Sequence, residues 1–232
     1  MDNFLRVKGS KLIDPCGKPL LIRGVNKMFI FEQDQAKRIG TNILPEIAKT
    51  GANCVRIVWG IRRVVGKDAE GNNITVNSSV QELDNVITNC KAQKMIPIIG
   101  LWDFTGDADS RSGFDRLSEY VDFWTRTDVL AVLKKHQNAL IINIANEAAP
   151  ECDDSSKQLN AILPEYIKVY TDVIIKIRAA GIKIPLIIDG LDFGKSLKCF
   201  SFIRTGQTIN TATELLNTDS QQNLIFYFHS YW

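Results

Sequence analysis

The sequence has no strong excess of charge of either sign and no long apolar run. Its 28 basic and 26 acidic residues are spread along the 232-residue chain and leave a net charge of +2. Such a balance does not favour nucleic acid or an anionic membrane as a partner. The longest apolar runs, such as 139–142 and 186–188, are far shorter than the ~20 residues that cross a bilayer. The sequence therefore predicts neither a membrane span nor a nucleic-acid partner, and an uncharged substrate fits.

Metal-binding and secretory patterns are also absent. The five cysteines are widely spaced without a C-x-x-C motif, and the two histidines, His136 and His229, form no metal motif. This spacing argues against a zinc cluster or a disulfide framework, and no metal or cofactor is predicted. The start, Met1-Asp2-Asn3, lacks the basic and apolar regions of a secretory signal. Either the protein is intracellular or its signal is not part of this sequence.

What is present is a regular alternation of strand-like and helix-like segments. Apolar runs begin near residues 53, 96, 140, 186 and 224, at steps of 43, 44, 46 and 38 residues, and an earlier run covers 20–25. Between them, apolar residues recur at helical spacing in 80–90 and 166–177. Gly51 and Gly181 follow helical segments, where left-handed C-caps are expected. With 45% hydrophobic residues, the pattern predicts a single α/β domain over 1–232 with a parallel sheet.

Two architectures fit this alternation: a doubly wound open sheet and a (β/α)₈ barrel. Polar and aromatic residues gather at the predicted carboxyl ends of the strands, where a barrel holds its active site. This distribution favours an incomplete TIM-type barrel, because only six β/α units are visible. The residues concerned are Asn26, Trp59, Trp102, Asp103, Asn146, Glu147, Asp189 and His229.

The segment from Asp189 to Ser196 resembles a phosphate-binding loop, G-x-x-x-x-G-K-[ST], and offers a competing interpretation. Asp189 replaces the first glycine, and Asp192 adds a second carboxylate within the loop. Both would repel phosphate, so a nucleotide-dependent function using Lys195 and Ser196 is disfavoured.

Several residues at the predicted strand ends suggest chemistry, and each has a structural alternative. Glu147 faces the predicted pocket, although a solvated loop glutamate would look the same. Arg56 interrupts an apolar strand, so it requires a partner, either in a core ion pair or in an active site. His229 and Tyr231 alternate, and therefore share a face. The tryptophans could pack in the core or stack on sugar rings; they are Trp59, Trp102 and Trp232.

Taken in order, five segments resemble glycoside hydrolase family five of clan A, and within it the bacterial endo-β-mannanases and cellulases. They are Leu21-Ile22-Arg23-Gly24-Val25-Asn26, Thr50-Gly51-Ala52-Asn53-Cys54-Val55-Arg56-Ile57-Val58, Trp102-Asp103-Phe104-Thr105-Gly106-Asp107, Ile141-Ile142-Asn143-Ile144-Ala145-Asn146-Glu147, and Asn223-Leu224-Ile225-Phe226-Tyr227-Phe228-His229-Ser230-Tyr231. The resemblance runs over nearly the whole chain. Members of the family are usually secreted.

The resemblance implies a retaining hydrolase of β-1,4-linked mannan or glucan. Glu147 would be the general acid/base and Asn146 would contact the sugar 2-hydroxyl. Arg56 would hold the nucleophile carboxylate, with His229 and Tyr231 lining the cleavage subsite. A retaining mechanism places two carboxylates ~5 Å apart. The residues expected to contact the polysaccharide or oligosaccharide are Asn26, Trp59, Trp102, Asp103, Asp189, Phe193 and Trp232.

The sequence also departs from the family pattern. The family nucleophile is a glutamate on the seventh strand, whereas this sequence reaches Trp232 after the sixth, so the nucleophile is expected to be absent. Trp102 stands where the family usually has histidine, and Ala148 where it usually has proline. A catalytically inactive carbohydrate-binding barrel is therefore the alternative function. Because open edges of a parallel sheet invite pairing, a homo-oligomer that covers the open barrel edge is also predicted.

Overall fold

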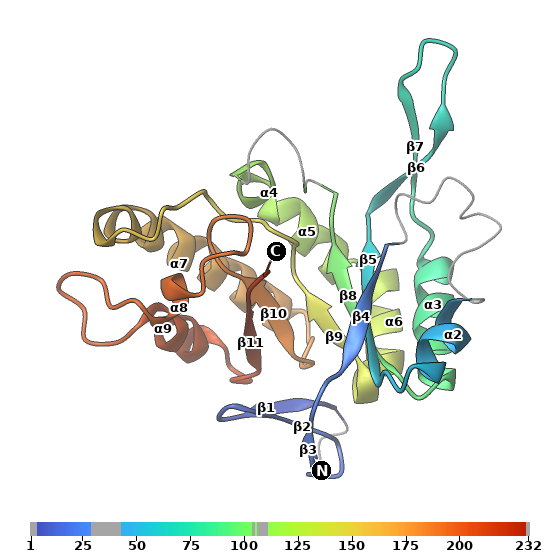
Figure 1. Cartoon of the computed structure of the whole chain (residues 1–232), viewed down its shortest axis with the longest axis horizontal. Helices are drawn as coiled ribbons and strands as arrows, with labels where there is room; N and C mark the ends of the chain where they lie inside the picture. The colour runs from blue at the N-terminus through green and yellow to red at the C-terminus, as the bar shows by residue number, and fades with distance from the viewer. Residues whose placement is uncertain (1–3, 29–42, 104, 106–110, 231–232) are drawn as a thin grey trace.

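The centre of the fold is a sheet of six parallel strands in the order β11-β10-β9-β8-β5-β4 (Figure 1). The computed structural model describes residues 4–28, 43–103, 105 and 111–230, apart from the side chains of residues 28, 63–66, 111 and 112. The strands of this sheet are β4 (Gly24–Met28), β5 (Cys54–Trp59), β8 (Ile96–Leu101), β9 (Ile141–Asn143), β10 (Leu186–Asp189) and β11 (Leu224–Tyr227).

The strand order decides between the two predicted architectures. Within this sheet each strand lies beside the strands that precede and follow it along the chain, so the winding never reverses. A doubly wound sheet would reverse its direction at a switch point. The fold is therefore an incomplete α/β barrel of six strands, as predicted, and the open-sheet alternative is wrong.

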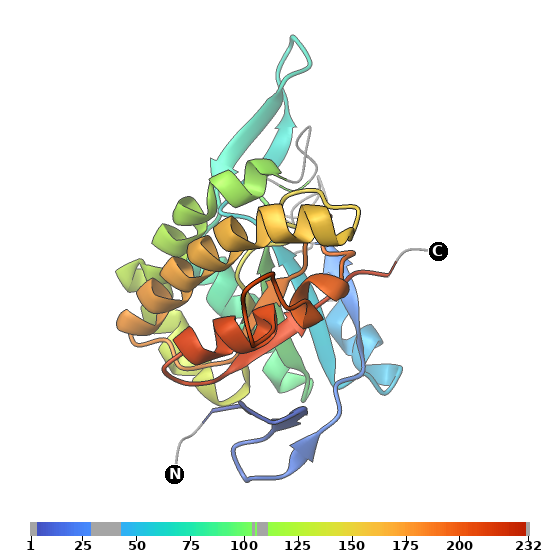
Figure 2. The ribbon, with the colours of Figure 1, turned by 90° about the vertical axis from the view of Figure 1, so that its left-hand side faces the viewer.

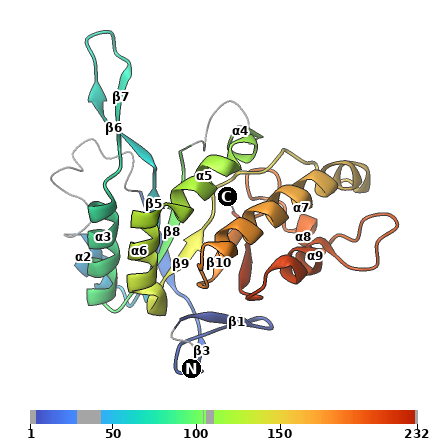
Figure 3. The same ribbon diagram turned by 180° about the vertical axis from the view of Figure 1, so that it is seen from behind.

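Helices cover the outer face of the sheet, as the view from behind shows (Figure 3). Among the described helices, none is both long enough and apolar enough to cross a membrane. The helical elements are α2 (Ile43–Lys49), α3 (Val80–Ala92), α4 (Arg111–Asp115), α5 (Leu117–Thr125), α6 (Thr127–His136), the 3₁₀ turn η1 (Gln137–Ala139), α7 (Ser156–Ala179), α8 (Lys198–Ser201) and α9 (Thr211–Thr218).

Local sequence signals explain where these helices begin and end and which of their faces are buried. Ser79 and Glu82 form a reciprocal capping box at the start of α3. The predicted apolar stripe of α3 is buried, including Leu83 and Ile87. Gly51 and Gly181 have φ values of +81° and +87°, which confirms the predicted left-handed caps after α2 and α7.

Two hydrophobic layers lie on the two faces of the sheet. The larger one packs the outer faces of the strands against the helices. The smaller one fills the inside of the sheet, and it includes Ile98, Ile141 and Ile187 together with Leu12 and Leu20 from an N-terminal sheet. That antiparallel sheet lies at the amino ends of the barrel strands (Figure 1) and consists of β1 (Arg6–Lys8), β2 (Lys11–Ile13) and β3 (Pro19–Leu20).

Three details differ from the prediction. The apolar run 20–25 is divided between β3 and β4, so Asn26 lies within β4 and not at its end. The strand expected over 140–145 is only Ile141–Asn143, because the chain turns before Glu147, which has a φ of +54°. A hairpin of β6 (Arg62–Lys67) and β7 (Asn73–Asn77) was not predicted, and it projects beyond the carboxyl ends of the barrel strands (Figure 2).

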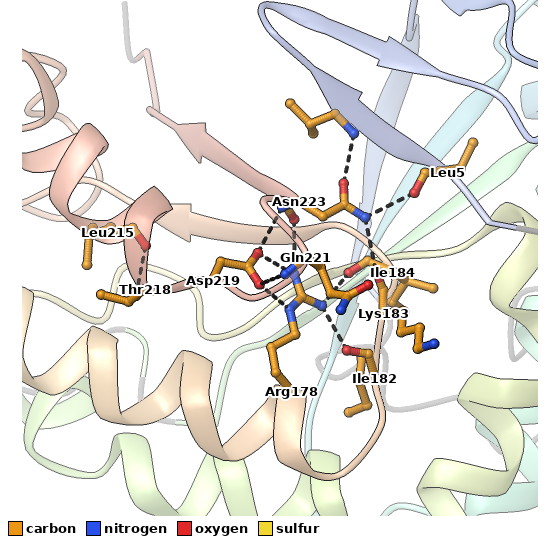
Figure 4. Close-up of polar contacts among 11 residues, drawn as sticks. Leu5, Arg178, Ile182, Lys183, Ile184, Leu215, Thr218, Asp219, Gln221 and Asn223 are labelled. Carbon is orange, nitrogen blue, oxygen red and sulfur yellow. Dashed lines mark hydrogen bonds and ion pairs between the residues drawn. The ribbon is translucent and has the colours of Figure 1, made fainter. Parts of the chain in front are cut away.

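A buried ion pair joins the elements at the amino ends of β10 and β11 (Figure 4). Arg178 of α7 donates from Nε and Nη2 to the two oxygens of Asp219 at 2.7 and 2.8 Å, and from Nη1 to the carbonyls of Ile182 and Ile184. Burial raises the pKa of Asp219, but Arg178 outweighs that effect and the pKa lies below its ordinary value. Asn223 links this cluster to the N-terminal sheet, because its Oδ1 accepts from the N–H of Val7 in β1 and its Nδ2 donates to the carbonyl of Leu5 just before that strand.

We predict that Arg178→Met lowers the free energy of unfolding by about 3–5 kcal/mol, because it leaves the buried Asp219 carboxylate without its cation. Urea denaturation measures the change. Lys168→Met is the matched control, since it removes an ion pair to Asp172 whose side chains are 76% and 55% exposed, and it should cost less than about 1 kcal/mol. Equal losses in the two variants would contradict this account of the buried pair.

Candidate active site

Glu147 lies four residues after the end of β9, in a turn at the carboxyl end of the barrel sheet. Its backbone is in the left-handed region, with φ +54°, which is uncommon for a residue other than glycine. Its N–H donates to Oδ2 of Asp189 at 2.9 Å, and its side chain is 12% exposed. The buried partner thus holds the turn, and the carboxylate of Glu147 is directed towards His229.

Asp189, the last residue of β10, is fully buried and connects three neighbours. Its Oδ1 accepts from Nδ2 of Asn143 at 2.9 Å, and its Oδ2 accepts from the N–H of Glu147. The same Oδ2 lies 3.1 Å from Nε2 of His229. Since Asp189 has no exposed surface, the structure corrects its predicted position: the side chain lies beneath the site and holds other residues, out of reach of a sugar.

His229 follows β11 and lies between two carboxylates. Its Nδ1 is 2.8 Å from Oε1 of Glu147, while Nε2 faces Asp189. Burial of the ring lowers its pKa, but the hydrogen bonds to Asp189 and Glu147 outweigh that effect and raise the pKa to about 9. His229 is therefore an imidazolium at neutral pH, with Nδ1 donating to Glu147 and Nε2 forming an ion pair with Asp189.

Arg56 occupies the inner face of β5 and is only 5% exposed. Its Nη2 donates to the side-chain oxygens of Asn143 and Asn146 at 2.5 and 2.7 Å. The guanidinium carbon lies 5.7 and 5.5 Å from the ring centres of Trp102 and Tyr227, within the range of cation–π attraction. Nε of Arg56 has no hydrogen-bond partner among the described residues. The hydrogen bond from Nη2 of Arg56 holds the side chain of Asn146, the residue before Glu147.

Asn143 connects the two halves of this network, and the prediction missed it as a site residue. It accepts from Arg56 and donates to Asp189, and it is fully buried. Gly100 of the neighbouring strand makes room for it, since a Cβ there would lie 3.0 Å from Oδ1 of Asn143. The available signal was an amide inside the apolar run Ile141-Ile142-Asn143-Ile144.

A cavity of about 310 Å³ opens beside this network. Both Asn26 and Trp102, which were predicted to contact substrate, line it together with Arg56 and His229. Four further lining residues complete its wall: Val58, Tyr227, Phe228 and Ser230. The volume falls at the lower end of the range typical of small-molecule sites.

Two further predicted contacts, Trp59 and Asp103, do not line this cavity. Trp59 is 4% exposed and belongs to the core on the helix side of β5, because alternation turns it away from Arg56. Asp103 accepts from the N–H groups of Ile61 and Arg62, both at 2.8 Å, and so anchors the start of the β6–β7 hairpin. Burial raises the pKa of Asp103, although these hydrogen bonds oppose the rise.

Phe193 lies in the loop after β10, is partly buried, and has the Lys195 ammonium 5.3 Å from its ring centre. Tyr231 and Trp232 lie outside the described residues. Within the described ranges, no group of three or more His, Cys, Asp or Glu side chains is arranged to hold a metal ion.

The family model of Cellulase (glycosyl hydrolase family 5) matches residues 13–232. The chain belongs to glycosyl hydrolase family 5. It is similar to the mannan endo-1,4-beta-mannosidases of Salipaludibacillus agaradhaerens and Cellvibrio japonicus, with 30% and 28% identity over 225 residues. Those matches cover 97% of this chain but 61% and 45% of the relatives. The family 5 chain thus spans about half of the length of the curated relatives it matches.

Solved structures of mannanases share the fold of this family 5 chain. The mannotriose complex of the Thermomonospora fusca β-mannanase matches with a TM-score of 0.75 and 24% identity, covering 100% of this chain and 67% of that one. The Streptomyces thermolilacinus β-mannanase with mannohexaose matches with a TM-score of 0.73 and 23% identity, covering 98% and 64%. These matches confirm the predicted barrel fold.

The raised pKa of His229 predicts a pH-dependent contribution to stability. Because the pKa is above its unfolded value, the contribution is complete below pH 6.5 and is lost as the pH rises through about 9. His229→Gln should therefore lower the free energy of unfolding by up to about 3 kcal/mol at pH 6, and by much less at pH 10. Chemical denaturation of both proteins at the two pH values measures this difference. A difference that does not depend on pH would contradict it.

Proposed function

We propose that the protein is a retaining, endo-acting hydrolase of β-1,4-linked polysaccharide, and that mannan is its substrate. One observation carries the proposal: Glu147 lies at the carboxyl end of a family 5 barrel strand, with its Oε1 2.8 Å from Nδ1 of His229. Arg56 and Trp102 line the cavity beside this pair. The names of its mannan endo-1,4-beta-mannosidase relatives support mannan over glucan. No cofactor enters the proposed reaction.

In the proposed reaction Glu147 is the general acid/base. In its protonated form it gives its proton to the glycosidic oxygen of the leaving sugar while the nucleophile carboxylate bonds to the anomeric carbon. In the second step the Glu147 carboxylate takes a proton from the water that cleaves the glycosyl-enzyme. Asn146, held by Arg56 and by Thr105, contacts the sugar 2-hydroxyl. His229 and Tyr231 line the cleavage subsite, and Asn26 and Trp102 contact the neighbouring sugar.

The opposing nucleophile carboxylate would lie ~5 Å from Glu147. We place it on a further strand beside β11, which pairs only with β10 among the described strands. The guanidinium of Arg56 supports this placement, because its Nε is buried and has no partner among the described residues. A carboxylate there would satisfy a donor that is costly to bury alone.

Sugar binding without cleavage is the alternative function, and Trp102 favours it. Its indole lines the cavity where family members usually carry a histidine, and an aromatic face binds sugar rings without assisting bond cleavage. The homo-oligomer stays a prediction: β4 and β11 are the outer strands of the described sheet, and a second copy that pairs along either edge would cover it.

Release of reducing sugar from β-mannan and carboxymethyl-cellulose by the complete gene product tests the function. Glu147→Gln should lower the rate on mannan by about 10²–10⁴-fold, because the side chain can no longer exchange a proton. Glu151→Gln is the matched control at an exposed position close in sequence, and its rate should not change. Equal rates for the parent and Glu147→Gln would remove Glu147 from the mechanism. Mannan binding without cleavage by the parent would establish the alternative.

A further inference from the structure

The loop after β10 brings a glycine against the ring of His229. Asp192, Phe193 and Gly194 all have left-handed backbones, with φ of 55°, 55° and 76°. The turn is closed by hydrogen bonds from the N–H of Gly194 to the carbonyl of Gly190 and from the N–H of Lys195 to that of Asp192. The carbonyl of Gly194 then accepts from the N–H of His229 at 2.8 Å. The loop and the histidine are therefore joined through their backbones.

The imidazole ring occupies the space that a side chain at position 194 would need. A Cβ on Gly194 would lie 3.0 Å from Cδ2, 3.2 Å from Cγ and 3.3 Å from Nε2 of His229. All three separations are shorter than ordinary van der Waals contact between such atoms. A methyl group at that position would require the ring or the loop to shift by a few tenths of an ångström.

Only a narrow range of ring orientations serves both of its hydrogen-bonding nitrogens. Nδ1 must face Glu147 at 2.8 Å while Nε2 faces Asp189 at 3.1 Å. Tyr227 packs against the ring edge to face, with ring centres 5.1 Å apart. Gly194 is thus one part of a tight enclosure, together with Tyr227 and the two carboxylates.

We propose that Gly194 is a positioning residue: its missing side chain lets the His229 ring pack directly against the loop, in the orientation that joins Glu147 to Asp189. The effect on turnover rests on the proposed role of Glu147, whereas the effect on the ring does not. The charged groups that face the ring are Glu147 in the turn after β9, Asp189 at the end of β10 and Arg56 within β5. A methyl group at 194 would move the imidazolium away from the two carboxylates that stabilise it.

The titration of His229 measures this arrangement directly. The sequence contains only His136 and His229, so NMR of the ¹³C,¹⁵N-labelled chain resolves both rings. In the unaltered chain the midpoint of His229 should be about 9. In Gly194→Ala it should fall towards its ordinary value of 6.5, while the His136 midpoint stays the same. A His229 midpoint that stays at about 9 in Gly194→Ala would overturn the proposal.

Gly206→Ala is the matched control. Gly206 has a φ of +80° and no atom within 4 Å of its ideal Cβ position, so the variant carries a similar backbone strain without the contact. Its His229 midpoint should equal that of the unaltered chain; an equal fall in both glycine variants would overturn the proposal, since strain alone would explain it.

A second measurement needs no variant and holds even if Gly194→Ala does not fold. The Hδ2 proton of His229 should give a strong nuclear Overhauser effect to the α-protons of Gly194, and its absence would also overturn the proposal. In the gene product, Gly194→Ala should lower kcat on mannan and leave KM nearly unchanged. If Glu147→Gln leaves hydrolysis intact while the His229 titration responds to Gly194→Ala, the proposed function fails and the positioning role stands.

Discussion

The buried carboxylate of Asp189 has no exposed surface, and a charge in that position is tolerated only if its oxygens are fully paired. Its partners come from different parts of the chain: the Asn143 amide, the backbone N–H of Glu147 and the ring of His229. Asn143 ends β9, Glu147 lies in the turn that follows it, and His229 follows β11. The need to satisfy one carboxylate therefore brings together the turn after β9 and the residue after β11. The left-handed turn at Glu147 persists because its N–H is committed to this bond.

The helix layer supports the same arrangement from outside. Tyr166 and Tyr170 belong to the buried stripe of α7, yet their hydroxyls donate to the carbonyls of Asp189 and Ala148 at 2.7 and 3.0 Å. The indole N–H of Trp124 donates to the carbonyl of Ile144 at 3.0 Å. Core packing and site geometry are thus coupled, because the aromatic rings that fill the core also hold the backbone that presents Glu147. At the other end of β10 and β11, the Arg178–Asp219 pair fixes the same elements.

Periodicity predicted most of the fold, since the spacing of apolar runs reflects the repeat of the β/α unit itself. It located β5, β8, β9, β10 and β11 to within a few residues, and Gly51 and Gly181 marked helix ends through their backbone conformation. It could not predict the β6–β7 hairpin, whose strand β7 is exposed throughout and so carries no burial pattern. Periodicity also could not show that Trp59 packs in the core while Trp102 lines the cavity. Trp59 is the last residue of β5 and Trp102 follows β8, and the direction of such a side chain depends on where its strand ends.

The sequence predicted residues of the site by their type, but it did not predict the hydrogen bonds and contacts between them. A polar residue at a strand end suggests a function, but only the register shows that Asn143 lies between Arg56 and Asp189. Gly194 was visible in the sequence solely as part of a phosphate-loop-like segment, and its contact with His229 arises from packing between β10 and β11. Asp189 was likewise predicted to contact the substrate, but its side chain is fully buried below the site.

A double-mutant cycle tests the central role of Asp189 most directly. The free energy of unfolding at pH 7 is measured for the parent chain, Asp189→Asn, His229→Gln and the double variant. Because the imidazolium depends on the Asp189 charge, the coupling energy should be about 2 kcal/mol, within the range for residues that share a buried network. A coupling energy below about 0.5 kcal/mol, as for independent sites, would contradict the view that this carboxylate organises the site.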